Sequence, residues 1–93
     1  MVYRIEISKK VKKELDKIPE HDRIKIVLRL KELAYVADDY QNSPLDIKPM
    51  QGVVDTFRLR VGDYRIVYEK FKMTLIIELL KVAHRKDVYK SEL

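Results

Sequence analysis

The chain has 93 residues and a mass of 11.1 kDa, with 20 Lys and Arg against 15 Asp and Glu, which gives a net charge of +5. This length favours one domain, residues 1–93, with a single modest core. The absence of cysteine excludes disulfides, zinc fingers, iron–sulfur clusters and a thiol nucleophile. We expect a cytoplasmic protein that does not bind membranes, because the most apolar stretch, residues 74–83, is short and interrupted by Glu78 and Lys81.

The first third of the chain predicts a strand and two helices. Residues 2–7 alternate as a strand does, and Ser8 stands at the N-cap position of a short helix that Pro19 ends. A second helix is predicted over residues 22–37. Four apolar residues widen the stripe formed by Ile26, Leu30, Leu33 and Ala37: Ile24, Val27, Leu28 and Tyr35. We expect packing against the first helix and the sheet to cover this wide face; the alternative is that a protein partner covers part of it.

Residues 38–55 predict an irregular segment, because turn-forming Asp, Asn, Pro and Gly are frequent there. Leu45, Ile47 and Met50 could attach this segment to the core. The adjacent carboxylates of Asp38 and Asp39 are expected to be solvated.

Residues 57–69 predict a β-hairpin. Two alternating runs flank Gly62 and Asp63, which have the sequence of a two-residue turn. Such a turn places Arg60 opposite Arg65. The apolar side chains then share one face of the hairpin, and the other face carries Arg58, Arg60 and Arg65.

A further strand is predicted over residues 74–83. An even-length turn after Glu69 pairs Glu69 with Thr74 and Arg65 with Glu78, which would bring Glu78 to the arginine face. The first strand of the chain could join either edge of this sheet.

The three hairpin arginines suggest an anion-binding surface. Directly opposed like charges destabilise a sheet, and the guanidinium fork suits phosphate groups. The alternative is a solvated polar face with a structural Arg–Glu pair. Residues 56–93 hold nine basic and five acidic side chains, so most of the excess positive charge lies in this part of the chain.

The end of the chain carries a second polar group, formed by His84, Arg85, Lys86 and Tyr89. His and Tyr can transfer protons, although a lone His near a C-terminus is more often a surface residue. A basic sheet face beside such a tail fits phosphodiester cleavage in RNA, where the 2′-hydroxyl of the RNA is the nucleophile. We therefore expect no cofactor and no metal, since two distant histidines without cysteine do not make a metal site.

Three segments of the chain resemble the RelE/ParE toxin superfamily of toxin–antitoxin systems: residues 50–52, 57–68 and 82–89. The combination of Arg-Val-Gly-Asp-Tyr-Arg with His-Arg-Lys-Asp-Val-Tyr at this separation is specific, and the resemblance covers essentially the whole chain. It implies an α+β fold in which two N-terminal helices pack on one face of a small twisted antiparallel sheet. The implied order is strand, helix, helix and three strands, with a short C-terminal tail.

The resemblance also implies a function. The protein would be the toxin of a type II system, an endoribonuclease that cuts mRNA in the ribosomal A site and leaves a 2′,3′-cyclic phosphate. Its partners would be the ribosome, mRNA and a cognate antitoxin wrapped around the toxin.

Catalytic roles follow residue by residue from the same resemblance. Arg65 matches the arginine that contacts the scissile phosphate, and Arg85 matches one that stabilises developing charge. Tyr89 matches a tyrosine that orients or activates the reacting groups. His84 stands where some relatives have a catalytic histidine. Because His84 and Arg85 have opposite parity, we expect the chain to leave the sheet near Ala83.

RNA-binding roles are expected for Arg58, Arg60, Lys81 and Lys86, of which Arg58 stands at a position that is basic in active members. Thr56 stands where the best-known member has a second lysine, so that proposed proton acceptor is absent. Two alternatives stay open. A ParE-like poison of DNA gyrase would share the fold and act by protein binding alone, and a degenerate relative would bind RNA without cutting it.

Overall fold

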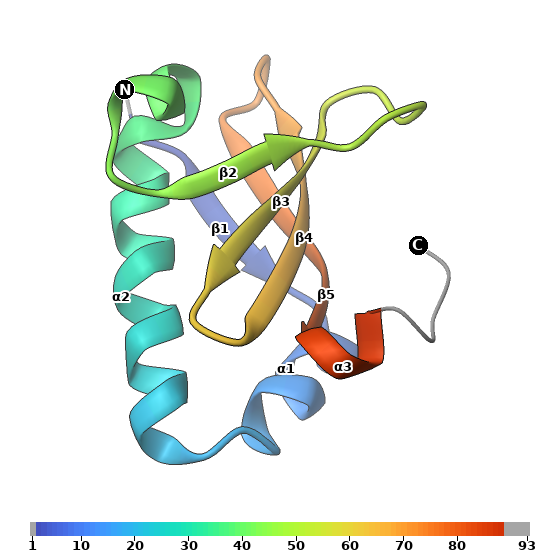
Figure 1. Ribbon diagram of the computed structural model, residues 1–93. Coiled ribbons are helices and arrows are strands. Elements are labelled where there is room, and N and C mark those ends of the chain that lie inside the picture. Colours follow the sequence, from blue (N-terminus) through green and yellow to red (C-terminus); the bar gives the residue numbers. More distant parts are fainter. Residues whose placement is uncertain (1, 89–93) are drawn as a thin grey trace.

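The computed structural model describes residues 2–88, with side chains described as far as Lys86. The order of elements is β1 (Arg4–Ile7), α1 (Lys9–Asp16), α2 (Glu20–Val36), the 3₁₀ helix η1 (Ala37–Asn42), β2 (Asp46–Pro49), β3 (Thr56–Val61), β4 (Tyr64–Phe71), β5 (Ile76–His84) and α3 (Arg85–Val88). The strands form one sheet, and α1 and α2 pack on one of its faces (Figure 1). The predicted α+β class is confirmed.

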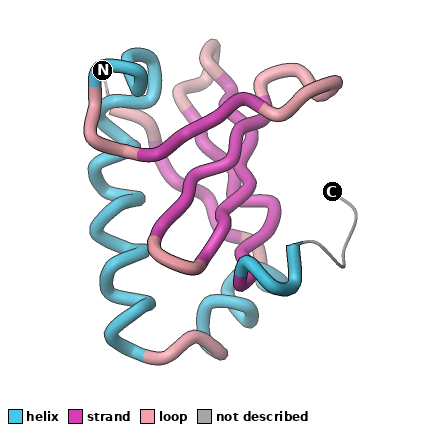
Figure 2. Tube along the Cα trace, viewed as in Figure 1, coloured by secondary structure: helices cyan, strands magenta, loops and turns pink. Residues whose placement is uncertain are grey.

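The sheet has the strand order β1–β5–β4–β3–β2, so the first strand lies at one edge and β2 at the other (Figure 2). β1 runs parallel to β5, whereas the other neighbours are antiparallel. The sheet is therefore mixed rather than wholly antiparallel. The alternation of residues 2–7 defines which side chains face the core, but carries no information about strand direction.

Both predicted helices are confirmed, and one expectation about their packing is wrong. Ser8 caps α1 by accepting a hydrogen bond from the Val11 amide at 3.2 Å. α2 buries one narrow stripe, formed by Ile26, Leu30, Leu33 and Ala34. The residues expected to widen this stripe remain exposed, with 40–70% of their surface accessible: Ile24, Val27, Leu28 and Tyr35. Neither α1 nor the sheet covers them.

The segment over residues 38–55 is more regular than expected. It contains η1 and the edge strand β2, whose Ile47 pairs with Leu59 of β3. Leu45 and Ile47 are buried, as expected, and Met50 is half-buried. The short length of β2 and its Pro49 explain why no strand was predicted.

Asp38 takes part in a network that ties η1 to the sheet. Its Oδ1 atom accepts a hydrogen bond from the Tyr3 hydroxyl at 2.8 Å and forms an ion pair with Lys70 Nζ at 3.2 Å. As expected, the Asp38 side chain is accessible to solvent, with 42% of its surface exposed, but it also has these two partners, which the sequence did not predict. Burial alone would raise the pKa of Asp38, but the bonds from Tyr3 and Lys70 outweigh it and hold that pKa below its usual value.

The β3–β4 hairpin has the predicted register. Arg60 faces Arg65 and Leu59 faces Ile66, and both of these apolar side chains are fully buried. The alternation of the two runs and the turn at Gly62 determine this pairing. Gly62 has a φ of +58°, a conformation that glycine adopts without a side-chain penalty.

The predicted pairing of β4 with β5 is wrong. β4 extends to Phe71, which pairs with Ile76, so that Glu69 faces Glu78 and Arg65 faces Ala83. A β-bulge follows, because Val67 pairs with Lys81 while Tyr68 pairs with Leu79, which leaves Leu80 as the extra residue. Glu78 consequently lies beside other carboxylates and not beside Arg65.

No helix within residues 2–88 is both long enough and apolar enough to cross a membrane.

Candidate anion-binding site

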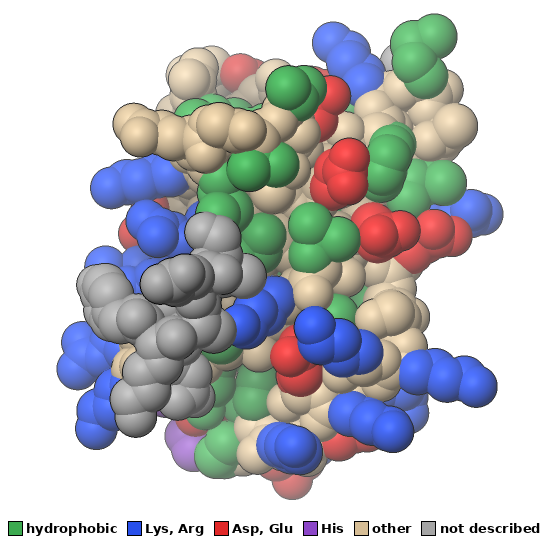
Figure 3. Space-filling view, turned by 90° about the vertical axis from the view of Figure 1, so that its right-hand side faces the viewer, with side chains coloured by type: hydrophobic (Ala, Val, Ile, Leu, Met, Phe, Trp, Pro, Cys, Tyr) green, Lys and Arg blue, Asp and Glu red, His purple; other side chains and the backbone are tan. Residues whose placement is uncertain are grey.

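The sheet face away from α2 carries four cationic side chains close together. β2, β3 and β4 each contribute to a small cavity of about 50 Å³, whose lining we call the arginine cluster: Asp46, Lys48, Arg58, Arg60 and Arg65. Figure 3 views the molecule from the side opposite α2 and shows lysines and arginines beside acidic side chains there. The five residues that line the cavity are all charged and their formal charges sum to +3, which favours a small anion such as phosphate.

Backbone pairing determines the position of each residue in the arginine cluster. Arg60 lies directly opposite Arg65 on β4 and opposite Asp46 on β2, and Lys48 lies opposite Arg58. Cross-strand partners point to the same side of a sheet. The register of three strands therefore brings four positive charges and one carboxylate onto the same surface.

Arg65 lies on the β4 side of the arginine cluster, and its side chain is incompletely satisfied. Its Nη1 atom is buried and has no hydrogen-bond partner among residues 2–88. A buried donor without a partner costs about 1–3 kcal/mol. An anion in the cavity would satisfy it, because a phosphate oxygen can accept hydrogen bonds from a guanidinium fork.

Arg85 lies next to the arginine cluster but does not line it. Its backbone amide donates to the Asp63 carbonyl at 2.6 Å, and its Nε lies 3.7 Å from Asp63 Oδ1. These contacts hold the start of α3 against the turn between β3 and β4. The Arg85 side chain is 52% exposed, so it is accessible at the edge of the site.

His84 does not join the arginine cluster. Its ring packs edge-on against Tyr64 at 5.3 Å, and both residues line a second cavity, which we call the α1–β5 cavity. The bulge at Leu80 explains this placement, because it shifts later residues of β5 to the opposite face. The chain leaves the sheet after His84, one residue later than expected.

Two predicted RNA-binding residues also lie outside the arginine cluster. Lys81 lines the α1–β5 cavity, and Lys86 is exposed on α3, where its amide donates to His84 Nδ1 at 3.2 Å. The predicted catalytic Tyr89 lies outside the described residues. The structure therefore brings together Arg58, Arg60 and Arg65 of the predicted set.

Sequence reasoning missed Lys48 and Asp46, because β2 was not recognised as a strand. The signal was present in principle. Ile47 is flanked by two charged residues, an alternation too short to distinguish from a loop.

Thr56, at the position of the missing lysine, is buried, and its hydroxyl donates to the Val54 carbonyl at 3.1 Å. Lys48 is therefore a lysine of the site that the sequence alone did not reveal.

Comparisons with known proteins place the chain in a family. Residues 5–89 match the family model of the ParE toxin of type II toxin–antitoxin systems, parDE. Toxin RelE3 of Methanocaldococcus jannaschii is 34% identical over 86 residues, which cover 92% of this chain and 94% of the relative.

Two crystal structures of complexes contain similar chains. One is the archaeal RelE–RelB complex from Pyrococcus horikoshii, with a TM-score of 0.78, 29% identity and coverage of 91% of this chain and 97% of the other. The other is the RelB–RelE antitoxin–toxin complex from Methanococcus jannaschii, with a TM-score of 0.69, 34% identity and coverage of 90% and 94%. The chain belongs to the ParE toxin family of type II toxin–antitoxin systems, within the RelE/ParE superfamily.

Proposed function

We propose that this toxin is a ribosome-dependent endoribonuclease that cuts mRNA in the ribosomal A site. The observation that carries the proposal is the arginine cluster, in which Arg65, whose Nη1 is buried without a partner among residues 2–88, lines one small cavity with Lys48, Arg58 and Arg60. The RelE names of its relatives support the same activity class. A ParE-like mechanism requires no such cluster, because it acts through protein contacts.

In the proposed reaction, the 2′-oxygen of one nucleotide attacks the adjacent phosphorus. The bond from phosphorus to the 5′-oxygen breaks, the 2′-hydroxyl loses its proton, and the leaving oxygen takes one up. The products are a 2′,3′-cyclic phosphate and a 5′-hydroxyl. Arg65, Arg58 and Lys48 would neutralise the phosphate oxygens, where negative charge increases in the transition state. Arg85 would approach from the turn, and Tyr89 keeps its proposed role in orienting the reacting groups.

The proposal is tested by primer extension on mRNA translated in a reconstituted system. Wild-type protein should produce cuts within A-site codons, and Arg65→Ala should slow them by about 10²–10³-fold, the effect of losing one preorganised charge donor. Arg29→Ala, on the outer face of α2, provides a matched control. Intact message at a concentration of toxin that stops translation would exclude the proposal.

The match to the ParE family model favours a second candidate, a poison of DNA gyrase that acts by binding. A supercoiling assay with purified gyrase separates the two candidates. Inhibition that survives Arg65→Ala and Tyr89→Phe would favour gyrase as the target. Absence of inhibition at micromolar toxin would remove this candidate.

We further propose that a cognate antitoxin covers the exposed face of α2. A cavity of about 340 Å³ between β1 and α2 is lined mainly by apolar side chains, including Ile7, Val27 and Tyr35. Lys31 lines it too, so an amphipathic segment with acidic residues would fit. Val27→Glu should prevent co-elution with the antitoxin in size-exclusion chromatography, whereas Lys12→Glu, on α1, should not. Unchanged co-elution of Val27→Glu would place the antitoxin elsewhere.

A further inference from the structure

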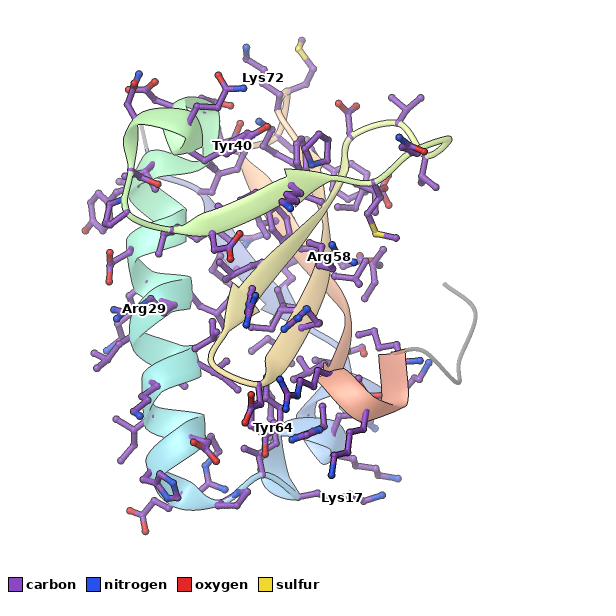
Figure 4. All side chains as sticks on the ribbon, in the orientation of Figure 1. Lys17, Arg29, Tyr40, Arg58, Tyr64 and Lys72 are labelled. Atoms are coloured by element: carbon purple, nitrogen blue, oxygen red, sulfur yellow. The ribbon has the colours of Figure 1, made fainter. Side chains whose placement is uncertain are left out.

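The α1–β5 cavity lies outside the arginine cluster and has no role in the proposed reaction. Its volume is about 360 Å³, within the range of small-ligand pockets. Lys17 and Ile18 follow α1, Tyr64 begins β4, and Val82 and His84 lie near the end of β5. Figure 4 shows Tyr64 and Lys17 at the same end of the molecule, beyond Arg58.

The cavity exists because β1 is shorter than β5. β1 ends at Ile7, which pairs with Leu79, so the later residues of β5 have no strand on that side. α1 covers part of this edge, and Glu14 Oε1 accepts a hydrogen bond from the Val82 amide at 3.0 Å. Backbone groups of an uncovered strand edge can bind other molecules. The edge beyond Glu14 therefore forms a wall that can offer hydrogen bonds.

The side chains in the cavity suit a planar ligand. The Tyr64 and His84 rings lie at 85° to each other, and Ile18 and Val82 supply buried hydrocarbon next to them. His84 Nδ1 accepts the Lys86 amide hydrogen at 3.2 Å, which leaves Nε2 as the ring nitrogen available for another hydrogen bond. Burial, together with the charges of Asp22 and Asp63, raises the pKa of Tyr64, which keeps its hydroxyl protonated.

The cavity can also contact an anion through Lys17, because the carboxylate of Glu14, which lines it too, is bonded to the Val82 amide. Aromatic rings that stack on a base, combined with lysines that contact phosphate, are typical of sites for single-stranded nucleic acid. A ligand with both a planar ring and a phosphate is a nucleotide.

The two sites flank the same end of the sheet. Tyr64 and Arg65 are consecutive in β4 and therefore point to opposite faces, as do their partners His84 and Ala83 in β5. Arg85 lies at the turn at this end of the hairpin. A strand of RNA that passes around this end would reach both faces.

We propose that the α1–β5 cavity binds one nucleotide of the RNA strand whose scissile phosphate lies at the arginine cluster. This inference rests on the proposed ribonuclease function for the identity of the ligand. The base packs against the ring of His84 and the wall of Ile18 and Val82, and Lys17 contacts a phosphate.

Nuclear magnetic resonance of the full chain, labelled with ¹⁵N, tests the proposal directly. Titration with AMP, CMP, GMP and UMP should shift the amide signals of Val82 and His84 and the His84 ring signals. Inorganic phosphate should shift the signals of the arginine cluster and leave the His84 ring unchanged. If the nucleotides shift only the arginine cluster, or shift the His84 ring no more than inorganic phosphate does, the proposal is wrong.

Variants identify the contacts. His84→Ala should weaken mononucleotide binding at least about fivefold, the lower end of the effect of removing one stacking partner, and His84→Phe should restore part of it. Lys17→Glu should weaken binding, whereas Lys12→Glu makes the same charge change on α1 outside the cavity and should not. Equal losses in both lysine variants would indicate attraction by net charge alone and would overturn the proposal.

A short single-stranded RNA distinguishes a strand from a free nucleotide as the natural ligand. Its affinity should fall in both Arg65→Ala and His84→Ala. An RNA affinity that does not depend on His84 would overturn the proposal, even if mononucleotides enter the cavity. The cleavage assay gives a separate result: nucleotide binding in the cavity without cleavage would contradict the ribonuclease function and not the site.

Discussion

Arg60 and Arg65 are direct cross-strand partners on one face of the β3–β4 hairpin. Two positive charges therefore lie side by side at a position where opposite charges would stabilise the sheet. Arg60 turns its Nε toward the Gly62 carbonyl at 3.4 Å. Opposed like charges are destabilising, and cross-strand pairs change stability by about 0.2–1 kcal/mol. Arg60→Thr should therefore raise the free energy of unfolding by about this amount, measured by urea denaturation, and weaken RNA binding. Arg29→Thr should not stabilise the protein, because this substitution removes the ion pair between Arg29 and Glu32.

Arg65→Met should stabilise the protein and remove its activity. Methionine keeps most of the side-chain volume and eliminates the buried Nη1 donor, so we expect a gain of about 1 kcal/mol in the free energy of unfolding. Cleavage should fall by about 10²–10³-fold in the primer-extension assay. A variant that is both inactive and less stable would show that Arg65 has a structural role, and the argument for a preformed anion site would fail.

These two predictions depend on the part of the fold that was most predictable. A two-residue turn at Gly62 and strict alternation on both sides leave one register for the hairpin, so the positions of Arg58, Arg60 and Arg65 followed from sequence. The β4–β5 pairing did not follow, because it depends on the length of β4 and on an extra residue at Leu80. Neither feature changes the alternation of side chains near the turn.

The arginine cluster could be predicted only in part, for a related reason. Lys48 reaches the cluster through the edge strand β2, and a strand of four residues that ends in proline has almost no periodic signal. His84 was expected near the arginines, and the bulge placed it on the opposite face. Local patterns thus located the side chains within one hairpin, and long-range pairing located the others.

The Tyr3 hydroxyl should make the free energy of unfolding depend on pH in the alkaline range. Burial, with the hydrogen bond to Asp38, raises the pKa of its hydroxyl to about 12, against 10 for an exposed tyrosine. The contribution is complete below pH 10, where the hydroxyl is neutral in both states, and is lost as the pH rises toward 12, because the unfolded state ionises first. Two pKa units correspond to a loss on the order of 3 kcal/mol. Tyr3→Phe should reduce this dependence in urea titrations between pH 9 and 12. Tyr35→Phe, at an exposed tyrosine, serves as the control and should leave this pH dependence unchanged.

Glu78 should be replaceable with a gain in stability. It lies between Glu69 on β4 and Glu6 on β1, so three carboxylates form a row across three strands. Glu78→Gln should raise the free energy of unfolding at pH 7 by about 0.2–1 kcal/mol. Screening shortens the range of repulsion, so the gain should shrink in 1 M salt. Glu32→Gln breaks an ion pair and should not stabilise. If Glu78→Gln destabilises the protein, an attractive contact must hold that carboxylate.

The bulge at Leu80 has a consequence for how this fold changes over generations. Leu80 stands between Leu79 and Lys81, which pair with the consecutive residues Tyr68 and Val67. If Leu80 were deleted, Lys81 would follow Leu79 directly and the same pairs would form without a bulge, so Val82 would stay in the core and His84 on its present face. If Leu80 stayed and the bulge were straightened, every later position of β5 would turn to the other face. The bulge therefore lets the strand carry one additional codon without changing which later side chains share the face of the arginine cluster.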